Sequence, residues 1–435
     1  MQTMVPLYGF GGGGGTGAAL TVTAPAGCTV TVSKDGKTKT KVAGADGTAV
    51  FKGLATGQWT VTITNGTDTA TDTVNLVADY TKAMSFVKIY GVRRGTGVES
   101  PTWGRTDEAV GMTATASVGT VSGHSDFDSC YPWSGIQRLT LSTGDVIVKI
   151  PKFWFQRYRE GDIEYIRIAD KPTDGFELHK AYKRGGKEVD CIYVGAHKTS
   201  DNNKSVPGAS PQVSQTRATM RNNARAKGDG WGLLDIDTLS AIQMLMLVEF
   251  ADNNMQDAIG RGYSDTSGER LVETGSCDPV PNLTGRPAGT DGLVDVVWRG
   301  IEGFWGNVNE WVDGVNFYDG KYYVCNDPSK YADDTELNYT ELSYTGSAGW
   351  MQHYITKLGI DDGLNHHVML PTEAGSGSAS TYQCDVCLSG SGWRILCRGG
   401  SLIHGSFNGL FETDLSPTSS ATSTIVGSRL QYIPQ

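Results

Sequence analysis

Hydrophobic and polar residues alternate with a period of two between Leu20 and Leu76. The alternation is clearest in five short runs, which are Leu20-Thr21-Val22, Val30-Thr31-Val32, Val50-Phe51, Trp59 to Ile63 and Val74-Asn75-Leu76. This pattern predicts strands with one buried face. The pairs Asp46-Gly47 and Asn65-Gly66 lie between such runs and are typical of hairpin turns. We therefore expect an antiparallel β-sandwich over residues 19–85.

The residues before this region predict no ordered element. Gly11 to Gly15 are five consecutive glycines, and ordering them would cost much conformational entropy. We expect residues 1–18 to form a flexible, Gly-rich leader. Within the sandwich, the segment Gly53 to Val61 resembles a strand of the Ig-like spacer modules of surface and tail proteins. The resemblance implies that the sandwich is Ig-like.

Residues 86–435 show weaker periodicity. Phe86 to Val92 and Asp145 to Ile150 predict strands, and the aromatic run Phe153 to Tyr158 is typical of a core or a subunit interface. Residues 239–250 predict a helix with Asp237 as its N-cap. Glycine, serine, threonine and asparagine dominate elsewhere, which indicates loops held on a small sheet. The expected fold class is therefore α+β.

The composition of the chain limits the classes of partner that it can bind. The chain of 435 residues carries a net charge of -10, which disfavours nucleic acid and anionic membranes because both need a cationic surface. No apolar run is long enough to span a bilayer, and no secretion signal is visible at the N-terminus, so we expect synthesis in the cytoplasm. Eight cysteines are too sparse for a disulfide scaffold, and Cys384-x-x-Cys387 lacks the further ligands of a zinc site. We expect neither a metal nor a cofactor.

Three segments resemble known proteins. Trp298 to Gly314 contains Gly-Asn-Val-Asn-Glu-Trp and is similar to the core motif of the C-type-lectin-like and formylglycine-generating-enzyme family. Trp393 to Ser401 is similar to a late strand of that family. Together with Gly405 to Phe411 and Gly427 to Leu430, it resembles the variable region of proteins diversified by retroelements in phage and prophage tails. The resemblance implies a C-type-lectin-like domain over 86–435, with a small antiparallel sheet and helices and a variable region at 394–430.

The same resemblance assigns roles to residues. Scaffold side chains should be buried, and they are Trp305, Trp311, Trp393, Leu410, Phe411 and Leu430. The expected ligand-binding residues are Ser401, Leu402, Ile403, His404, Ser406, Phe407, Glu412, Asp414, Ser416, Ala421, Ser423 and Ile425. All of them except Ser401, Ser406 and Ala421 should share one exposed face. A core position for Ile403 and Phe407 is the alternative. In some relatives the equivalents of Asn307 and Glu310 help to bind calcium, whereas here we expect them to hold irregular backbone.

These residues predict a binding protein, not an enzyme. The related enzymes use a cysteine pair near the C-terminus, and this chain has no cysteine after Cys397. His366-His367 lacks an adjacent carboxylate motif and is expected to be a loop pair. We expect a phage tail adhesin in the virion that binds a protein or glycan on a cell surface and can form oligomers. The alternatives are a structural tail or baseplate component that contacts other virion proteins, a formylglycine-generating-type enzyme or a depolymerase.

Overall fold

The computed structural model describes residues 17–268, 270–349 and 351–434, and the chain divides into two compact units, residues 1–87 and 88–435. The sequence-based boundary between 85 and 86 lies two residues before this division. The predicted leader falls outside the described residues except for its last two positions. Ala18, the last of them, already begins the first strand.

The first unit consists of two sheets around one core. Its strands are β1 (Ala18–Thr23), β2 (Thr29–Lys34), β3 (Lys37–Val42), β4 (Thr48–Leu54), β5 (Gly57–Thr64), β6 (Thr69–Leu76) and β7 (Tyr80–Ala83). The sheet orders are β4-β1-β7 and β3-β2-β5-β6. The alternate apolar residues of both sheets form a single cluster that includes Leu20, Val30, Phe51 and Val61. Each of the five predicted runs lies in one of these strands, because a half-exposed sheet imposes the period of two that the sequence shows.

Two five-stranded sheets belong to the second unit. The first has the order β17-β15-β16-β8-β9. Its strands are β8 (Ile89–Gly95), β9 (Gly104–Asp107), β15 (Trp154–Glu160), β16 (Ile163–Ala169) and β17 (Glu177–Leu178). The second has the order β13-β14-β20-β34-β21. Its strands are β13 (Gln137–Thr140), β14 (Val146–Pro151), β20 (Cys191–Gly195), β21 (Trp231–Leu233) and β34 (Leu430–Tyr432).

Most strands of the last 130 residues belong to one nine-stranded sheet. Its order is β27-β26-β25-β31-β32-β30-β28-β29, and β33 pairs with β25. Its strands are β25 (Asn309–Tyr318), β26 (Lys321–Val324), β27 (Thr340–Thr345), β28 (His353–Leu358), β29 (Pro371–Gly375), β30 (Val386–Ser389), β31 (Trp393–Arg398), β32 (Thr413–Leu415) and β33 (Val426–Gly427). Short ladders are formed by β10 (Ala114–Thr115) with β12 (His124–Ser125), by β18 (Lys183–Arg184) with β19 (Lys187–Glu188), and by β11 (Ser117–Val118), β22 (Gly285–Arg286), β23 (Val297–Trp298) and β24 (Ile301–Glu302).

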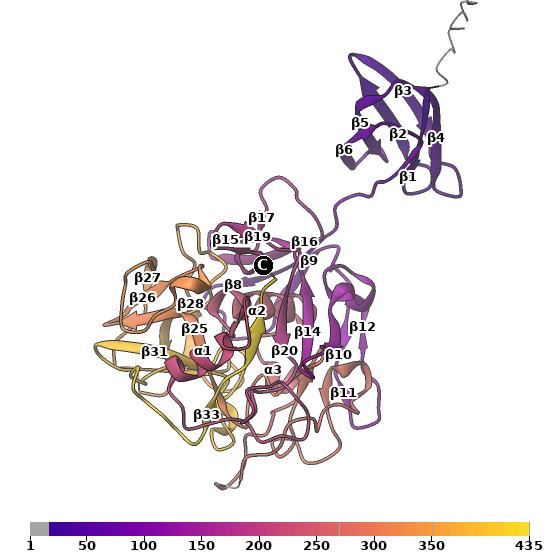
Figure 1. Cartoon of the computed structure of the whole chain (residues 1–435). Coiled ribbons are helices and arrows are strands. Elements are labelled where there is room, and N and C mark those ends of the chain that lie inside the picture. Colours follow the sequence, from indigo (N-terminus) through magenta and orange to yellow (C-terminus); the bar gives the residue numbers. More distant parts are fainter. Residues whose placement is uncertain (1–16, 269, 350, 435) are drawn as a thin grey trace, which may run out of the picture. The chain divides into compact units, whose positions relative to one another are not determined.

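The helices are few. They are α1 (Arg217–Arg225), α2 (Ile236–Phe250) and α3 (Met255–Ala258), with 3-10 turns η1 (Asp126–Ser129), η2 (Trp133–Gly135), η3 (Lys180–Tyr182), η4 (Pro281–Leu283), η5 (Pro328–Lys330) and η6 (Gly405–Phe407). Helix α2 lies inside the second unit, where it contacts β8, β16 and β25 (Figure 1). Its N-cap is Asp235, whose side chain accepts from the Thr238 amide, and not Asp237 as the sequence suggested. Asp237 is instead buried in the first turn and pairs with Arg184.

The predicted α+β class is wrong. Strands hold 39% of the chain and helices 11%, so the protein is mostly β. The small antiparallel sheet with helices expected for residues 86–435 is replaced by several sheets, one of them nine-stranded. The physical reason is strand length. Many strands of this unit have only two to four residues, and a period of two cannot be recognised over so few positions.

Candidate binding surface in the C-terminal segment

The predicted scaffold residues are buried with one exception. Trp305, Trp311, Leu410, Phe411 and Leu430 are each at most 1% exposed. The expected burial of Trp393 is wrong, because its side chain is half-buried at the start of β31. Its ring contacts those of Tyr318 and Tyr323, with centroids 4.8 and 5.7 Å apart.

The Asn and Glu of the core motif hold the fold together. The Asn307 side chain donates to the carbonyl oxygen of Val272 and accepts from its amide. Glu310 is buried among three cations, with Arg429 Nη2 at 2.7 Å, Lys198 Nζ at 3.0 Å and Arg398 Nη1 at 3.7 Å. These positive charges already compensate the carboxylate, so the arrangement at Glu310 does not fit a calcium ion.

The segment after β31 is a loop whose backbone is fixed from several sides. The Gly400 amide donates to Glu412 at 3.0 Å, and the Asn408 amide group donates to the carbonyl oxygen of Ser401 at 2.7 Å. The Phe411 amide donates to Asp385 at 2.7 Å. A β-carbon at Gly400, where φ is +73°, would lie 1.6 Å from Asn408 Oδ1. Glycine is therefore required for this close approach.

Distant segments hold the loop tip. The carbonyl oxygen of Leu402 accepts from the amide and the hydroxyl of Thr266, at 3.0 and 2.9 Å. The Gly405 amide donates to the carbonyl oxygen of Ser264 at 3.0 Å, and Gln256 donates to the carbonyl oxygen of Gly405 at 3.2 Å. These bonds are made by the loop backbone, so they do not depend on which side chains the loop carries.

Several side chains of this loop face outward. Ile403 is 49% exposed, and His404, Ser406 and Phe407 are partly exposed. The Phe407 ring meets the Tyr354 ring edge-on with centroids 5.7 Å apart, and the Tyr354 hydroxyl lies 3.5 Å from Ser406 Oγ. We call the loop residues Ile403 to Phe407 the 403–407 surface. The alternative of a core position for Ile403 is contradicted by its exposure.

Three of the predicted ligand-binding residues are buried, which corrects the prediction. Leu402 is 2% exposed, Ser401 is fully buried with its hydroxyl 3.3 Å from His404 Nδ1, and Glu412 is 4% exposed. Glu412 anchors the Gly400 amide, and burial together with the Asp414 charge raises the pKa of its carboxyl well above the usual range. These three side chains support the loop from inside.

The remaining predicted residues belong to other parts of the domain. Asp414, in β32, is partly exposed and accepts from the amide and hydroxyl of Ser416. Ala421 packs on a cluster that contains Trp311. The carbonyl oxygens of Ser423 and Ile425 accept from the amides of Ser214 and Asn309, which lie near α1 and β25. These contacts connect Ala421, Ser423 and Ile425 with Trp311, Ser214 and Asn309, and none of them involves the 403–407 surface.

Other residues of this region were not predicted. Tyr354 lies on β28. The Arg261–Asp265 ion pair, at 2.8 Å, lies close to Gly405, since a β-carbon built at Gly405 would be 3.3 Å from Asp265 Oδ1. Tyr354 is 52 positions from Ser406 in the chain and Asp265 is 140 positions from Gly405, so no spacing in the sequence links them to the loop. Only the chain fold brings them together.

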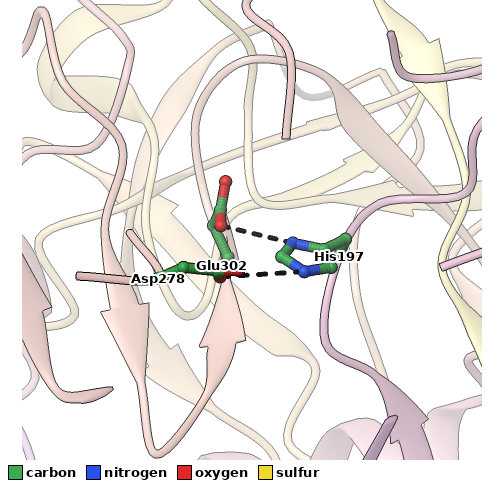
Figure 2. Close-up of side chains that lie close together, drawn as sticks. All are labelled: His197, Asp278 and Glu302. Carbon is green, nitrogen blue, oxygen red and sulfur yellow. Dashed lines mark ion pairs between the residues drawn. The ribbon is translucent and has the colours of Figure 1, made fainter. Parts of the chain in front are cut away.

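A second cluster, also absent from the sequence-based prediction, contains His197, Asp278 and Glu302. Figure 2 shows the imidazole facing both carboxylates, with Nδ1 3.2 Å from Glu302 and Nε2 3.8 Å from Asp278. His197 and Glu302 are buried, and the three ligand atoms lie within 4.8 Å of one another. Histidine and carboxylates bind divalent metals, so the cluster must be tested as a metal site.

The position of Arg138 argues against a metal. Its Nη2 lies 2.9 Å from His197 Nε2 and 2.6 Å from Asp278 Oδ1. A guanidinium only donates, so Nε2 accepts from Arg138, and Nδ1 lies 3.2 Å from Glu302 but makes no hydrogen bond among the described residues. A metal at Nδ1 would force a proton onto Nε2 against the Arg138 donor, and a metal at Nε2 would have to displace Arg138. These residues do not fit a metal ion and instead form a polar bridge in which His197 and Glu302 are buried and Asp278 is exposed.

The two adjacent histidines serve different elements. His367 is buried, with Nε2 2.6 Å from Asp237 at the start of α2. His366 lines an open pocket of about 610 Å³ and lies 2.5 Å from Glu177 of β17. The hydrogen bond with Glu177 raises the pKa of His366, although burial acts in the opposite direction. His366 thus joins the loop 360–367 to β17, whereas His367 joins it to the start of α2.

A pH-dependent difference in stability should follow for the variant His366→Gln. A raised histidine pKa means that the stabilisation is complete below about pH 6.5, the unfolded value, and is lost as pH rises through the folded value. The melting temperature of the wild type should exceed that of the variant most near pH 6, and this difference should shrink by about pH 9. His353→Gln, which removes an exposed histidine without an ion pair among the described residues, should show no such trend. Thermal melts at several pH values measure both, and a constant difference would contradict the assignment.

Comparisons with known proteins add little. No family model and no curated protein matches the chain. Among solved structures, it is similar to the Major Tropism Determinant P3c Variant and U1 Variant, with 10% and 11% identity. Each alignment covers 87% of this chain and 82% of the other, with a TM-score of 0.25. A likeness at this score supports no conclusion about fold or function. Within the described residues, no helix has the length and apolar character needed to cross a membrane.

Proposed function

We propose that this chain is a ligand-binding protein that attaches a phage tail to a molecule on the host surface through the 403–407 surface. The observation that carries the proposal is that the backbone of this loop is held by the fold while several of its side chains are exposed. Its backbone is bonded to Ser264, Thr266 and Gln256, whereas the side chain of Ile403 is exposed and those of His404 and Phe407 are partly so. A rigid scaffold that presents apolar side chains to solvent is typical of a binding surface.

Energetics favours binding over a structural role for these side chains. Truncation of a buried side chain costs roughly 2–5 kcal/mol, whereas exposed positions usually change stability by less than about 0.5 kcal/mol. Ile403 should therefore contribute little to folding. Partly buried Phe407 contributes more, through its edge contact with Tyr354. The exposed Ile403 and the partly exposed Phe407 belong to the same loop and are suitable anchors for a partner, because a few large side chains supply most of the binding energy of an interface.

The test is the double variant Ile403→Ser/Phe407→Ser. Labelled wild-type protein should bind intact cells of some strains in a bacterial panel, and the double variant should lose this binding while its melting temperature falls by only a few degrees. The matched control is Val110→Ser/Val121→Ser, which removes two apolar side chains that are 68% and 70% exposed elsewhere on the domain. The control should bind like the wild type. Unchanged binding by the loop variant, or equal loss in both, would refute the proposed surface.

A further inference from the structure

A polar pocket of about 550 Å³ lies between the end of α1, the edge strand β21 and the turn η5. None of the residues of the 403–407 surface lines it. Its lining includes Lys187, Arg221, Arg225, Asp229 and Trp231. The pocket is thus a separate place on the second unit, and its chemistry can be derived from these side chains.

The pocket presents basic groups with unused donors. Arg221 binds Asp313 and Asp333 through Nε and Nη2, but its Nη1 has no hydrogen bond among the described residues and is not sealed from solvent. Arg225 is exposed, and within the described ranges only its Nη2 makes a hydrogen bond, to the carbonyl oxygen of Pro328 at 2.6 Å. Lys187 is exposed and has no ion pair in the described part of the chain. Guanidinium and ammonium donors of this kind recognise carboxylates and other anions.

The acidic groups of the pocket are less available. Asp313 is held by Arg221, with a shortest N–O distance of 2.7 Å. Asp327 Oδ1 accepts from the amide and hydroxyl of Ser329. Asp229 is exposed at the glycine-rich segment before β21 and can accept hydrogen bonds from ligand hydroxyls. The pocket therefore offers both anion-binding donors and a hydroxyl acceptor.

Trp231 supplies a flat apolar wall. Its indole is partly exposed, the Lys227 ammonium lies 4.8 Å from its ring centroid, and the Tyr432 ring is 5.4 Å away. A β-carbon at Gly230 would lie 2.2 Å from the carbonyl oxygen of Ile433, so glycine lets this segment lie against the C-terminal strand. Aromatic side chains of this kind combine apolar contact area with one polar end.

The volume sets the size of the ligand. At about 30 Å³ per water molecule, the pocket has room for roughly 18 waters, far more than a phosphate or acetate ion displaces. We propose that it binds an acidic saccharide of about two rings. The carboxylate pairs with Arg225, Lys187 and the free Nη1 of Arg221, a sugar face lies on Trp231, and hydroxyls donate to Asp229.

Calorimetric titration of the full chain with digalacturonate tests this proposal, with its dimethyl ester as the uncharged analogue and inorganic phosphate as the small anion. Digalacturonate should bind, and Arg225→Gln and Lys187→Gln should each weaken binding by roughly tenfold, because a charge-assisted hydrogen bond is lost. The ester and phosphate should also bind at least about tenfold more weakly. Arg93→Gln, an exposed arginine on β8 outside the pocket, is the matched control and should bind as the wild type does.

Three results would overturn the proposal. They are no binding of digalacturonate at millimolar concentration, equal binding by the ester, and equal binding by phosphate. Unchanged affinity in both pocket variants would overturn the location. Since Lys187 and Arg225 are exposed, melting temperatures close to that of the wild type should confirm that both variants fold.

Discussion

Replacing Glu310 with alanine should destabilise the second unit by about 3–5 kcal/mol, because the change leaves buried positive charges without their counter-ion. Arg429, Lys198 and Arg398 surround this carboxylate, and the Arg429 guanidinium also donates to the carbonyl oxygens of Gly195 and Glu302. Burial alone would raise the pKa of Glu310, but the three cations outweigh it and lower the pKa to about 2. The carboxylate is therefore ionised at all ordinary pH values.

Urea denaturation of the full chain, followed by tryptophan fluorescence, measures this effect. The control Glu341→Ala removes an exposed carboxylate paired with Lys321 on the surface, and it should cost less than about 1 kcal/mol. A depressed carboxyl pKa stabilises the fold above the unfolded value of about 4.3 and loses this contribution as pH falls toward 2. The gap between wild type and Glu310→Ala should accordingly narrow in acid. A cost for Glu310→Ala no larger than that of the control would contradict the network.

The sequence predicts the first unit better than the second because the strands of the first unit are buried on one face only. In β2 and β5, every second side chain enters the core, and alternation is then visible in the sequence. In β25 nearly all ten residues are buried, so the strand shows no alternation. Helix α2 is also buried on nearly all sides, and its position was nevertheless predictable from its long apolar run, although the sequence assigned the N-cap to Asp237 instead of Asp235.

The sequence motifs located the candidate site, but they did not predict which of its residues are exposed and which are buried. The resemblance placed binding side chains along 401–425, and exposure agrees at Ile403 and Ser416. Leu402 is buried where the distant residues Asn307 and Thr266 bind its backbone, and Glu412 is buried where it accepts from the Gly400 amide. The orientation of a loop side chain depends on such long-range bonds, which local sequence does not encode.

Trp311→Ala and Trp393→Ala should differ strongly, although the sequence assigns both to the scaffold. Trp311 is 1% exposed, packs with Met220, Ile395 and Leu430, and donates its indole N–H to the carbonyl oxygen of Gln215 at 3.1 Å. Its removal leaves a large cavity and an unpaired carbonyl between α1 and β25, and should cost about 3–5 kcal/mol.

Trp393 is the matched comparison because the same substitution removes the same indole. Its ring is half-buried and lies on Tyr318 and Tyr323, so part of the space left by its removal is open to solvent and no closed cavity forms. We expect a cost of about 1–2 kcal/mol, well below that of Trp311→Ala. Urea midpoints of the two variants give the comparison directly. Equal losses of unfolding free energy would mean that Trp393 stabilises the nine-stranded sheet as strongly as Trp311 does. A larger loss for Trp311→Ala, as expected, would mean that β25 is stabilised mainly by packing on the side that faces α1.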